Sequence, residues 1–408
     1  MLTPDDILKI RRDFPLLQRK VYGRDLIYLD NSATTQAPKV VVDKIEEMYF
    51  QHKANVHRGV HRLSQEGTDM MEHTRERVRR FIGAESVSEV IFTRGATEAI
   101  NLVASSYGQL LRPGDEVVLT RMEHHANIVP WQLLRDRMGI VIRVVPLLPD
   151  GSLDMDAYAG LLNEKTKIVS AAHVSNVLGT VNPVKEMARM AHDAGAIMVV
   201  DGAQSIAHTD VDVRDIGADF YAFSSHKMYG PTGIGVLYGR KDLLDRMPPY
   251  QGGGEMISHV TFEHTTYADL PFKFEAGTPD YVGIAALHTA VDYLTGIGTA
   301  AIAAHEDELM RHAQERMIAE IPGIRIFGTA PGKAGIISFL IGNAHHYDTG
   351  LLLDKLGIAV RTGHHCAQPL MQWLGIEGTV RASFAVYNTM EEADRFVDAL
   401  LRIAPMLA

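Results

Sequence analysis

Between residues 89 and 238, short apolar runs rich in β-branched residues alternate with stretches of helical periodicity. The short runs predict buried strands, and the periodic stretches predict helices that cross from one strand to the next. This alternation favours an α/β fold with a largely parallel sheet covered by helices on both faces. Strands are expected at 89–93, 116–120, 140–145, 167–172, 197–201, 219–223 and 235–238, and helices at 97–108, 128–138, 155–162 and 183–194.

The pattern changes near residue 295 and predicts a smaller α+β domain. Helices are expected at 300–320, 348–356 and 390–403, and strands at 324–327, 335–340, 359–362 and 379–385. An amphipathic helix is expected over residues 1–20. Because 408 residues exceed one ordinary core, we expect three parts. These are an N-terminal helical segment at 1–25 that packs with the small domain, a large cofactor-binding domain at 26–294 and a small C-terminal domain at 295–408.

Composition and charge exclude several classes of protein. The chain is 46% hydrophobic and 22% charged, which is typical of a globular protein. Its net charge is −10 and no run of Lys and Arg stands out, so nucleic acid is not an expected partner. No apolar run reaches the ~18–20 residues of a membrane span, and the N-terminus lacks a secretory pattern. A cytoplasmic protein without a membrane partner is therefore expected.

The segment FSSHKMYGP at 223–231 carries the strongest chemical signal. Lys227 follows a predicted strand and lies among small polar residues and glycine. A buried lysine has a lowered pKa, so its neutral amine is available to form a Schiff base. A lysine in this position is, however, most often a surface residue when it is considered alone.

Two other strand ends change that interpretation. Asp201 ends an apolar predicted strand, at the edge where α/β proteins bind ligands. It is either a helix N-cap or a carboxylate that keeps a pyridine nitrogen protonated. Thr97 follows Gly95 at a strand-to-helix turn, where backbone N–H groups and the helix dipole favour a phosphate. The three features together indicate a pyridoxal-phosphate site.

With the Asp-x-Ala-Gln run at 201–204 and Ser-x-His-Lys at 224–227, the chain resembles the aminotransferase class V group of fold-type I pyridoxal-5′-phosphate (PLP) enzymes. The similarity extends from residue 28 to 389. Segments 56–59, 122–127, 173–179 and 361–367 resemble most closely the SufS-type, or group II, cysteine desulfurases and selenocysteine lyases. The resemblance implies an α/β fold with a mostly parallel mixed sheet and a smaller α+β domain. It also implies PLP as the cofactor and L-cysteine or L-selenocysteine as the substrate.

The resemblance also implies roles for matching residues. Lys227 would bind PLP as a Schiff base, Asp201 would pair with the pyridinium nitrogen, and His124 would stack on the ring and move protons. Gln204 would bond the ring hydroxyl, while Ala96, Thr97, Asn176, Ser224 and His226 would complete the cofactor site, with Thr278 reaching the phosphate of the other subunit of a homodimer. Substrate contacts are expected from Arg381, Asn176, Arg361, His57 and Arg58. The alternative for Arg381 is a structural arginine in an ion pair.

Cys366 is the only cysteine, so an intrachain disulfide is excluded. A free thiol is commonly buried and inert, but this one lies in a loop beside His364 and His365, where exposure and partial ionisation are expected. The resemblance makes it the nucleophile that takes sulfur as a persulfide and passes it to a SufE-like or SufU-like acceptor for iron–sulfur cluster assembly. Adjacent histidines diverge and lack zinc-ligand spacing, so no metal is expected.

Other functions remain open at this point. A selenocysteine lyase or cysteine sulfinate lyase acting directly through PLP would need Cys366 less. A class V aminotransferase or a kynureninase-like enzyme needs no thiol in this loop. A non-catalytic scaffold of a sulfur-transfer complex is the alternative from another class, and the presence of Lys227, Asp201 and Cys366 together argues against it.

Overall fold

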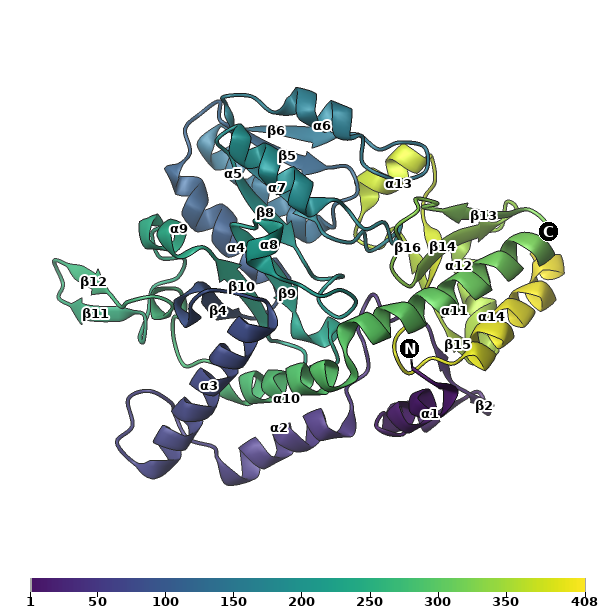
Figure 1. Cartoon of the computed structure of the whole chain (residues 1–408), viewed down its shortest axis with the longest axis horizontal. Helices are drawn as coiled ribbons and strands as arrows, with labels where there is room; N and C mark the ends of the chain where they lie inside the picture. The colour runs from purple at the N-terminus through teal and green to yellow at the C-terminus, as the bar shows by residue number, and fades with distance from the viewer. Residues whose placement is uncertain (1, 408) are drawn as a thin grey trace.

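The computed structural model describes residues 2–407 and is built around a seven-stranded sheet (Figure 1). Its strands along the chain are β4 (Val90–Thr93), β5 (Glu116–Thr120), β6 (Val141–Val145), β7 (Thr166–Ala172), β8 (Ile197–Asp201), β9 (Phe220–Ser224) and β10 (Gly235–Gly239). Across the sheet they lie in the order β4-β10-β9-β8-β7-β5-β6. Strand β10 runs antiparallel to the other six strands, which all point the same way. The expected α/β fold with a mostly parallel mixed sheet is confirmed.

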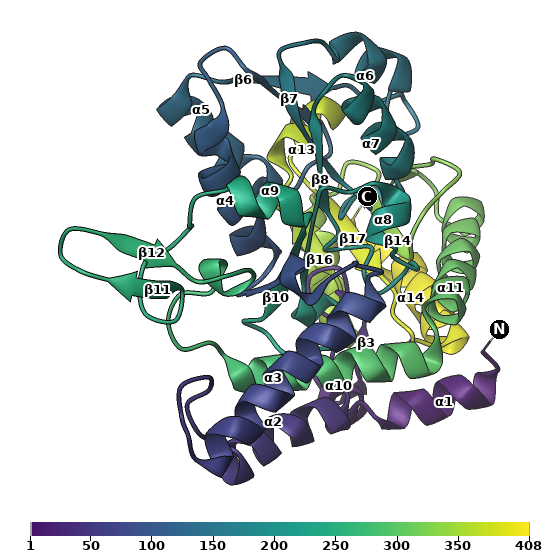
Figure 2. The same cartoon turned by 60° about the vertical axis from the view of Figure 1, so that its left-hand side comes forward.

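Helices cover both faces of this sheet, as the sequence pattern predicts (Figures 1 and 2). Successive strand residues point to opposite faces, so Val118 joins one buried cluster while Val117 and Leu119 join another. The cluster with Val117 packs under α4 (Ala96–Ser106), α5 (Val129–Met138) and α9 (Lys241–Arg246). The cluster with Val118 packs under α3 (Arg62–Phe81), α6 (Met155–Leu161), α7 (Val184–Asp193), α8 (Val213–Ile216) and α10 (Tyr281–Ile297).

The last third of the chain forms a separate antiparallel sheet with its own buried cluster. Its strands are β13 (Ile324–Phe327), β14 (Ile336–Ile341), β17 (Thr379–Ser383) and β16 (Arg361–Gly363), in that order. Its helices are α11 (Thr299–Glu320), α12 (His346–Lys355), α13 (Gln368–Leu374) and α14 (Met390–Ile403). The strand expected at 359–362 is instead two strands, because β15 (Ile358–Ala359) leaves this sheet to pair with β3 (Ile27–Tyr28). The domain limits at residues 25 and 294 stay predictions.

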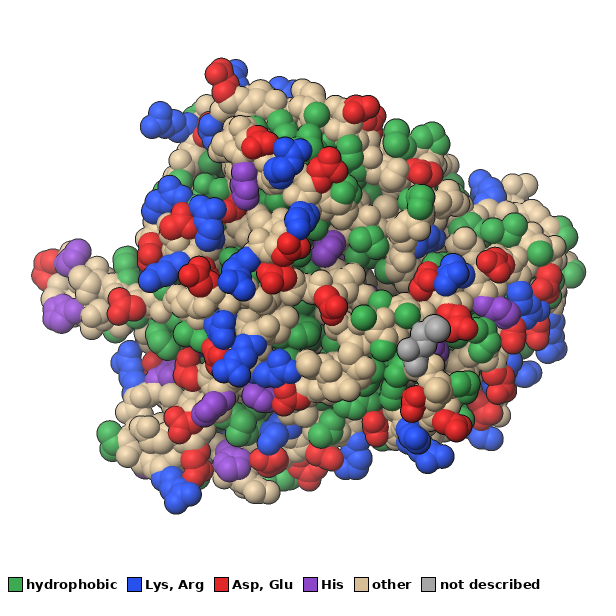
Figure 3. Space-filling view, in the orientation of Figure 1, with side chains coloured by type: hydrophobic (Ala, Val, Ile, Leu, Met, Phe, Trp, Pro, Cys, Tyr) green, Lys and Arg blue, Asp and Glu red, His purple; other side chains and the backbone are tan. Residues whose placement is uncertain are grey.

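The structure differs from expectation at several elements. The N-terminal helix α1 (Pro4–Arg12) ends before residue 20, because Pro15 lacks an N–H group and disfavours helix in the residue before it. The sequence pattern did not reveal α2 (Lys39–Gln51), α3 or α10, nor the short pair β1 (Lys20–Val21) and β2 (Arg24–Asp25). It also missed the hairpin of β11 (Ile257–Val260) and β12 (Thr265–Tyr267), which projects from the body (Figures 1 and 3).

The topology gathers five strand ends at one place. Strands β4, β5, β7, β8 and β9 all point the same way, so their carboxyl ends share one edge of the sheet. Open α/β sheets bind ligands at this edge. The second sheet closes over it, since Ser338 Oγ on β14 donates to the carbonyl of Val177 at 2.7 Å. None of the helices in residues 2–407 combines the length and apolar character needed to cross a membrane.

Candidate active site

A cavity of about 180 Å³ lies at the carboxyl edge of the sheet. Its walls come from loops that follow five different strands, which explains how residues distant in sequence meet there. Among the expected site residues, the lining contains Ala96, Thr97, His124, Asn176, Asp201, Gln204, Ser224, His226 and Lys227. The structure therefore brings together every cofactor residue that the sequence indicated, except Thr278.

Lys227 and Asp201 provide two ionisable groups in this cavity. Lys227 is half-buried in the 3₁₀ turn that follows β9, and Asp201 is buried at the end of β8. Burial lowers the pKa of Lys227, although the charge of Asp201 opposes this shift. Burial likewise raises the pKa of Asp201, whose Oδ1 accepts the N–H of Ala203 at 3.0 Å. A lysine in this setting supplies a neutral amine more readily than an exposed one.

The N-terminus of α4 forms the end of the cavity suited to an anion. Ser224 Oγ accepts the N–H of Ala96 at 2.8 Å and so fixes the first turn of the helix against β9. The backbones pack closely there, because a Cβ on Gly235 would lie 2.4 Å from the Cα of Gly95. Burial and the charge of Lys227 lower the pKa of His226 to about 4, so its ring is neutral at pH 7. The helix dipole and free N–H groups favour a phosphate here.

His124 lies in the turn between β5 and α5. Its Nδ1 accepts the N–H of Ala126 at 3.0 Å, so the proton of the neutral ring is on Nε2. Burial, followed by the charge of Lys227, lowers the pKa of His124 to about 3. The imidazole is therefore neutral at pH 7, and its Nε2–H is the ring group left to interact with a ligand.

Arg381 on β17 is buried beside the cavity, with 3% exposure. Its Nη1 donates to the carbonyl of Asn176 at 2.8 Å, and its Nη2 lies 3.3 Å from Asp30 Oδ1. Its Nε is buried and has no hydrogen-bond partner among the described residues. Burial lowers its pKa to about 10, so the group keeps its charge at pH 7. Arg361 is exposed and lies 3.6 Å from the other oxygen of Asp30.

The loop that carries Cys366 is tied to the cavity wall. Asn176 Nδ2 donates to the carbonyl of His365 at 2.8 Å, and His125 N–H donates to the carbonyl of Cys366 at 2.7 Å. The N–H of Cys366 donates to His364 Nδ1 at 3.1 Å. Both His365 and Cys366 adopt positive φ angles, 51° and 55°, which non-glycine residues rarely do. These contacts attach the loop of the half-buried thiol to the cavity wall at Asn176.

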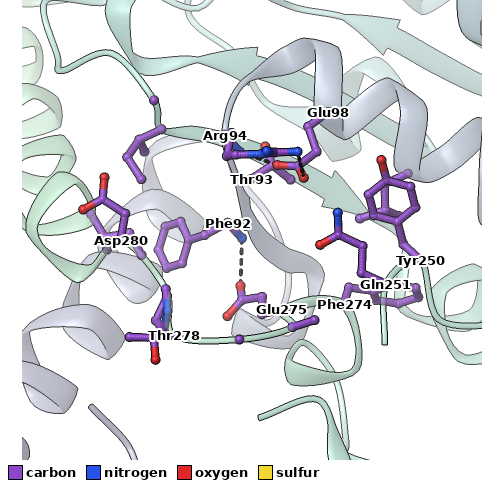
Figure 4. Close-up of a pocket in the computed structure, with 17 residues that line it drawn as sticks. Phe92, Thr93, Arg94, Glu98, Tyr250, Gln251, Phe274, Glu275, Thr278 and Asp280 are labelled. Carbon is purple, nitrogen blue, oxygen red and sulfur yellow. Dashed lines mark hydrogen bonds and ion pairs between the residues drawn. The ribbon is translucent and has the colours of Figure 1, made fainter. Parts of the chain in front are cut away.

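Six expected site residues are not part of the lining of this cavity. Arg381 and the loop of Cys366 are bonded to Asn176 in its wall, and Arg361 lies beside Asp30 with Arg381. The other three, His57, Arg58 and Thr278, lie elsewhere. His57 Nδ1 lies 3.7 Å from Glu255 Oε2, and Arg58 Nε lies 3.1 Å from Glu255 Oε1. Thr278 lines a different cavity, of about 360 Å³, with Arg94 and other residues (Figure 4). His57, Arg58 and Thr278 are thus not brought to the Lys227 cavity within this chain.

Two carboxylates at the site were missed by sequence reasoning. Asp30 holds Arg381 and follows an apolar run, which is the same signal that identified Asp201. Glu123 is fully buried next to His124, and no sequence pattern predicted its burial. Within residues 2–407, no cluster of three His, Cys, Asp or Glu side chains is arranged to hold a metal ion.

A mostly parallel sheet with lysine, aspartate and a helix N-terminus at its carboxyl edge, beside a smaller antiparallel sheet, is the fold-type I architecture of PLP enzymes. The sequence model of the aminotransferase class-V family matches residues 27–396. The chain belongs to this family.

Individual relatives match over almost the full length. The chain is 51% identical over 403 residues to a cysteine desulfurase of Pectobacterium carotovorum subsp. carotovorum strain PC1, covering 98% of both sequences. Its structure is similar to the apo cysteine desulfurase of Thermococcus onnurineus NA1, with a TM-score of 0.94, 40% identity and coverage of 100% and 99%. It is also similar to the S-sulfonic acid form of the cysteine desulfurase CsdA of Escherichia coli, with a TM-score of 0.91, 37% identity and coverage of 98% and 99%.

Proposed function

We propose that the protein is a PLP-dependent cysteine desulfurase that converts L-cysteine to L-alanine and transfers the sulfur to Cys366. One observation carries the proposal: the loop with the only thiol is bonded to Asn176, a wall residue of the cavity that contains Lys227 and Asp201. Relatives with this name, at 51% and 40% identity over nearly the whole chain, support it.

The cavity fits the cofactor. Lys227 would hold PLP covalently through Nζ, while Asp201 would pair with the ring nitrogen and Gln204 with the ring hydroxyl. The anion-binding end of the cavity, at the start of α4, would take the phosphate through Ala96, Thr97, Ser224 and His226. When bound, PLP accepts the electron pair of a broken Cα–H bond into its ring.

Arg381 would bind the substrate carboxylate. Its unpaired Nε and a neighbouring N–H form the fork that a carboxylate matches, and Asp30 keeps the guanidinium in place. Asn176 and Arg361 would complete the contact. Lys227 would be released when the amine of the substrate takes its place on the cofactor. Its neutral amine, favoured because burial lowers the pKa, would then remove the Cα proton and later return a proton to the product.

Cys366 would perform the sulfur transfer. Its Sγ, as thiolate, attacks the substrate sulfur, so that an S–S bond forms while the Cβ–S bond breaks. The electron pair of the broken bond stays with the carbon fragment, which is protonated and leaves as L-alanine. Cys366 then carries a persulfide. The Nε2–H of His124 would act at the substrate sulfur, and a positioned acid or base of this kind is worth roughly 10²–10⁴ in rate.

The test is release of sulfide and alanine from L-cysteine with a reductant, comparing wild type with Cys366→Ala. We expect both products from wild type and neither from the variant. Cys366→Ser keeps the size of the side chain and controls for folding, and it should stop desulfuration while sparing selenocysteine cleavage. If wild type and Cys366→Ala behave alike, a lyase acting directly through PLP replaces the proposal.

The persulfide would pass to a SufE-like or SufU-like protein that feeds iron–sulfur cluster assembly in the cytoplasm. The surroundings of Cys366 suit such an exchange, because the thiol is half-buried and the neighbouring Arg361 and His364 are exposed. A thiolate of the acceptor attacks the outer sulfur, and the Cys366 thiol is regenerated.

A homodimer would complete the site. Thr278 shares the second cavity with Arg94, which is two residues before the first residue of α4 (Figure 4). A twofold interface brings the same patch of both chains together, so the partner's Thr278 would approach this chain's phosphate end. The ring of His57 packs edge-on against the ring of Phe272, with 5.3 Å between the two ring centroids. Phe272 is close in sequence to Thr278. His57 and Arg58 would therefore serve the partner's substrate.

A further inference from the structure

Glu123 is a fully buried carboxylate directly before His124. Three groups donate hydrogen bonds to it. Thr120 Oγ1 and the N–H of Ala172 reach its Oε1 at 2.5 and 3.0 Å, and Asn127 Nδ2 reaches its Oε2 at 2.7 Å. No reaction step described above uses this group.

The orientation of Asn127 is fixed from its other side. Its Oδ1 accepts from Trp131 Nε1 at 2.9 Å and from Ser170 Oγ at 2.6 Å. The amide nitrogen must therefore face Glu123. Burial raises the pKa of Glu123 to about 7, while the three donors oppose this shift. The N–H of Ala172 and the amide nitrogen of Asn127 can only donate, so each carboxylate oxygen accepts at least one hydrogen bond, whereas the Thr120 hydroxyl can donate or accept.

The carboxylate links two strands where their backbone pairing stops. The last paired residues of β5 and β7 are Leu119 and Ser170. The N–H of Ala172 therefore has no backbone acceptor on β5. Glu123 supplies the missing acceptor. Its other two partners, Thr120 and Asn127, stand on either side of the turn that carries His124. The carboxylate thus closes this turn and attaches it to β7, whose last residue lines the cavity.

We propose that Glu123 is a positioning residue that holds the turn between β5 and α5, so that His124 presents its Nε2–H in the cavity beside Lys227. This inference rests on the proposed desulfurase function. Glu123 itself touches neither cofactor nor substrate, because it is buried beneath the turn and is not part of the cavity wall.

Glu123→Gln tests the role with almost no change in size. The glutamine turns its oxygen toward Thr120 and Ala172, so its N–H₂ group faces the fixed amide nitrogen of Asn127 and two donors oppose each other. We expect kcat to fall about 10- to 100-fold, since displacement of a catalytic group by ~1 Å costs up to that much. The KM for L-cysteine should stay within about threefold, because Arg381 is unaffected.

Glu116→Gln is the matched control. Glu116 is on the same strand, is only 3% exposed and is held by Arg143 and Asn163 at the opposite end of the sheet. It should leave kcat unchanged. If Glu123→Gln does not fold, Thr120→Val removes one donor at nearly constant shape and should lower kcat in the same direction, about 3- to 10-fold.

A double-mutant cycle separates positioning from general structural support. In a His124→Ala background, Glu123→Gln should lower kcat by less than about threefold, because residues that act as a unit are not additive. A full loss in that background would overturn the proposal.

A measurement without turnover completes the test. In ¹⁵N-histidine-labelled protein, the ring signals of His124 are assigned by their loss in His124→Ala. In wild type these signals should show that Nδ1 accepts a hydrogen bond. They should shift in Glu123→Gln but not in Glu116→Gln. Unchanged signals overturn the inference. A wild type that makes no alanine contradicts the desulfurase proposal instead, and the ring signals still report on positioning.

Discussion

Arg381 shows how one residue can satisfy two interpretations at once. The sequence allowed either a substrate-binding arginine or a structural ion pair. The structure shows the ion pair with Asp30, and it also shows a buried Nε without a partner. An unpaired buried donor is costly, and a ligand carboxylate would remove that cost. The ion pair therefore fits a role in orienting the group, and substrate binding is left to the free side of the guanidinium.

Arg381→Lys should raise the KM for L-cysteine about 10- to 100-fold. A lysine keeps the positive charge but loses the planar pair of N–H donors that binds a carboxylate. Each charge-assisted hydrogen bond contributes about 1.5–3 kcal/mol, which gives the size of the effect. Steady-state kinetics of alanine release measure the change. Arg311→Lys, in an exposed pair with Asp307 on α11, is the control and should leave KM unchanged. An unaltered KM in Arg381→Lys would assign the residue to the ion pair alone.

The residues predicted from sequence share a visible signal, whereas the contacts that give the missed residues Glu123 and Asp30 their importance do not show in the sequence. Lys227, Asp201 and Thr97 each follow an apolar run, and strand ends in an α/β sheet meet at one edge. The hydrogen bonds of Glu123 come from Ala172 and Asn127. The partner of Asp30 is Arg381, which is 351 positions away in the sequence. Burial and partners of this kind arise from tertiary packing. A single sequence does not display them.

The same distinction appears among the elements. Strands β5 and β8 match their predicted limits at both ends, since each is buried on both faces and reads as a short apolar run. Helix α10 was missed for the opposite reason. It packs against α2 and α3, and its residues also join the buried cluster under the sheet. Apolar side chains therefore occur on most sides of the helix, and the sequence shows no clear 3.6-residue hydrophobic period.

Strand β10 offers a test of how an element supports the site. Gly235→Ala would place a Cβ 2.4 Å from the Cα of Gly95, at the start of α4. We expect a loss of about 1–3 kcal/mol in stability from overpacking, together with weaker cofactor binding, because Gly95 precedes the phosphate end of the cavity. Thermal unfolding and a PLP titration followed above 400 nm measure both effects.

Gly160 supplies the control for that substitution. It lies in helix α6, and a Cβ there would meet no atom within 4 Å. Gly160→Ala should therefore leave cofactor binding unchanged and raise stability by about 0.5–1 kcal/mol. Equal melting temperature and cofactor affinity in Gly235→Ala and wild type would show that the two backbones can separate without cost.

At the scale of the whole molecule, buried neutral histidines make the fold sensitive to acid. Burial lowers the pKa of His365 to about 2, against 6.5 for an unfolded chain. The unfolded state therefore binds a proton first as pH falls, so this contribution to stability is complete above pH 6.5 and declines below it. Between pH 7 and 5 the loss is roughly 2 kcal/mol for this one group.

His365→Gln should reduce the acid sensitivity by about that amount, because glutamine keeps an N–H near Thr379 and does not titrate. Urea unfolding at pH 7 and pH 5 measures the difference. His264→Gln, on the exposed hairpin, should behave like wild type. An identical pH dependence in His365→Gln and wild type would contradict the prediction.

The proposed dimer can be tested through residues that do not line the cavity of their own chain. Arg58 lies beside Glu255 and does not line the cavity that contains Lys227. If it serves the partner, a mixed dimer of Lys227→Ala and Arg58→Ala chains has one site with both defects and one site with neither. Such a dimer should show about half of wild-type activity, although each parent homodimer has almost none. Two affinity tags isolate the mixed species, and doubly tagged Lys227→Ala dimers provide the control. If Arg58 acted within its own chain, each site of the mixed dimer would lack one residue, and activity would not return.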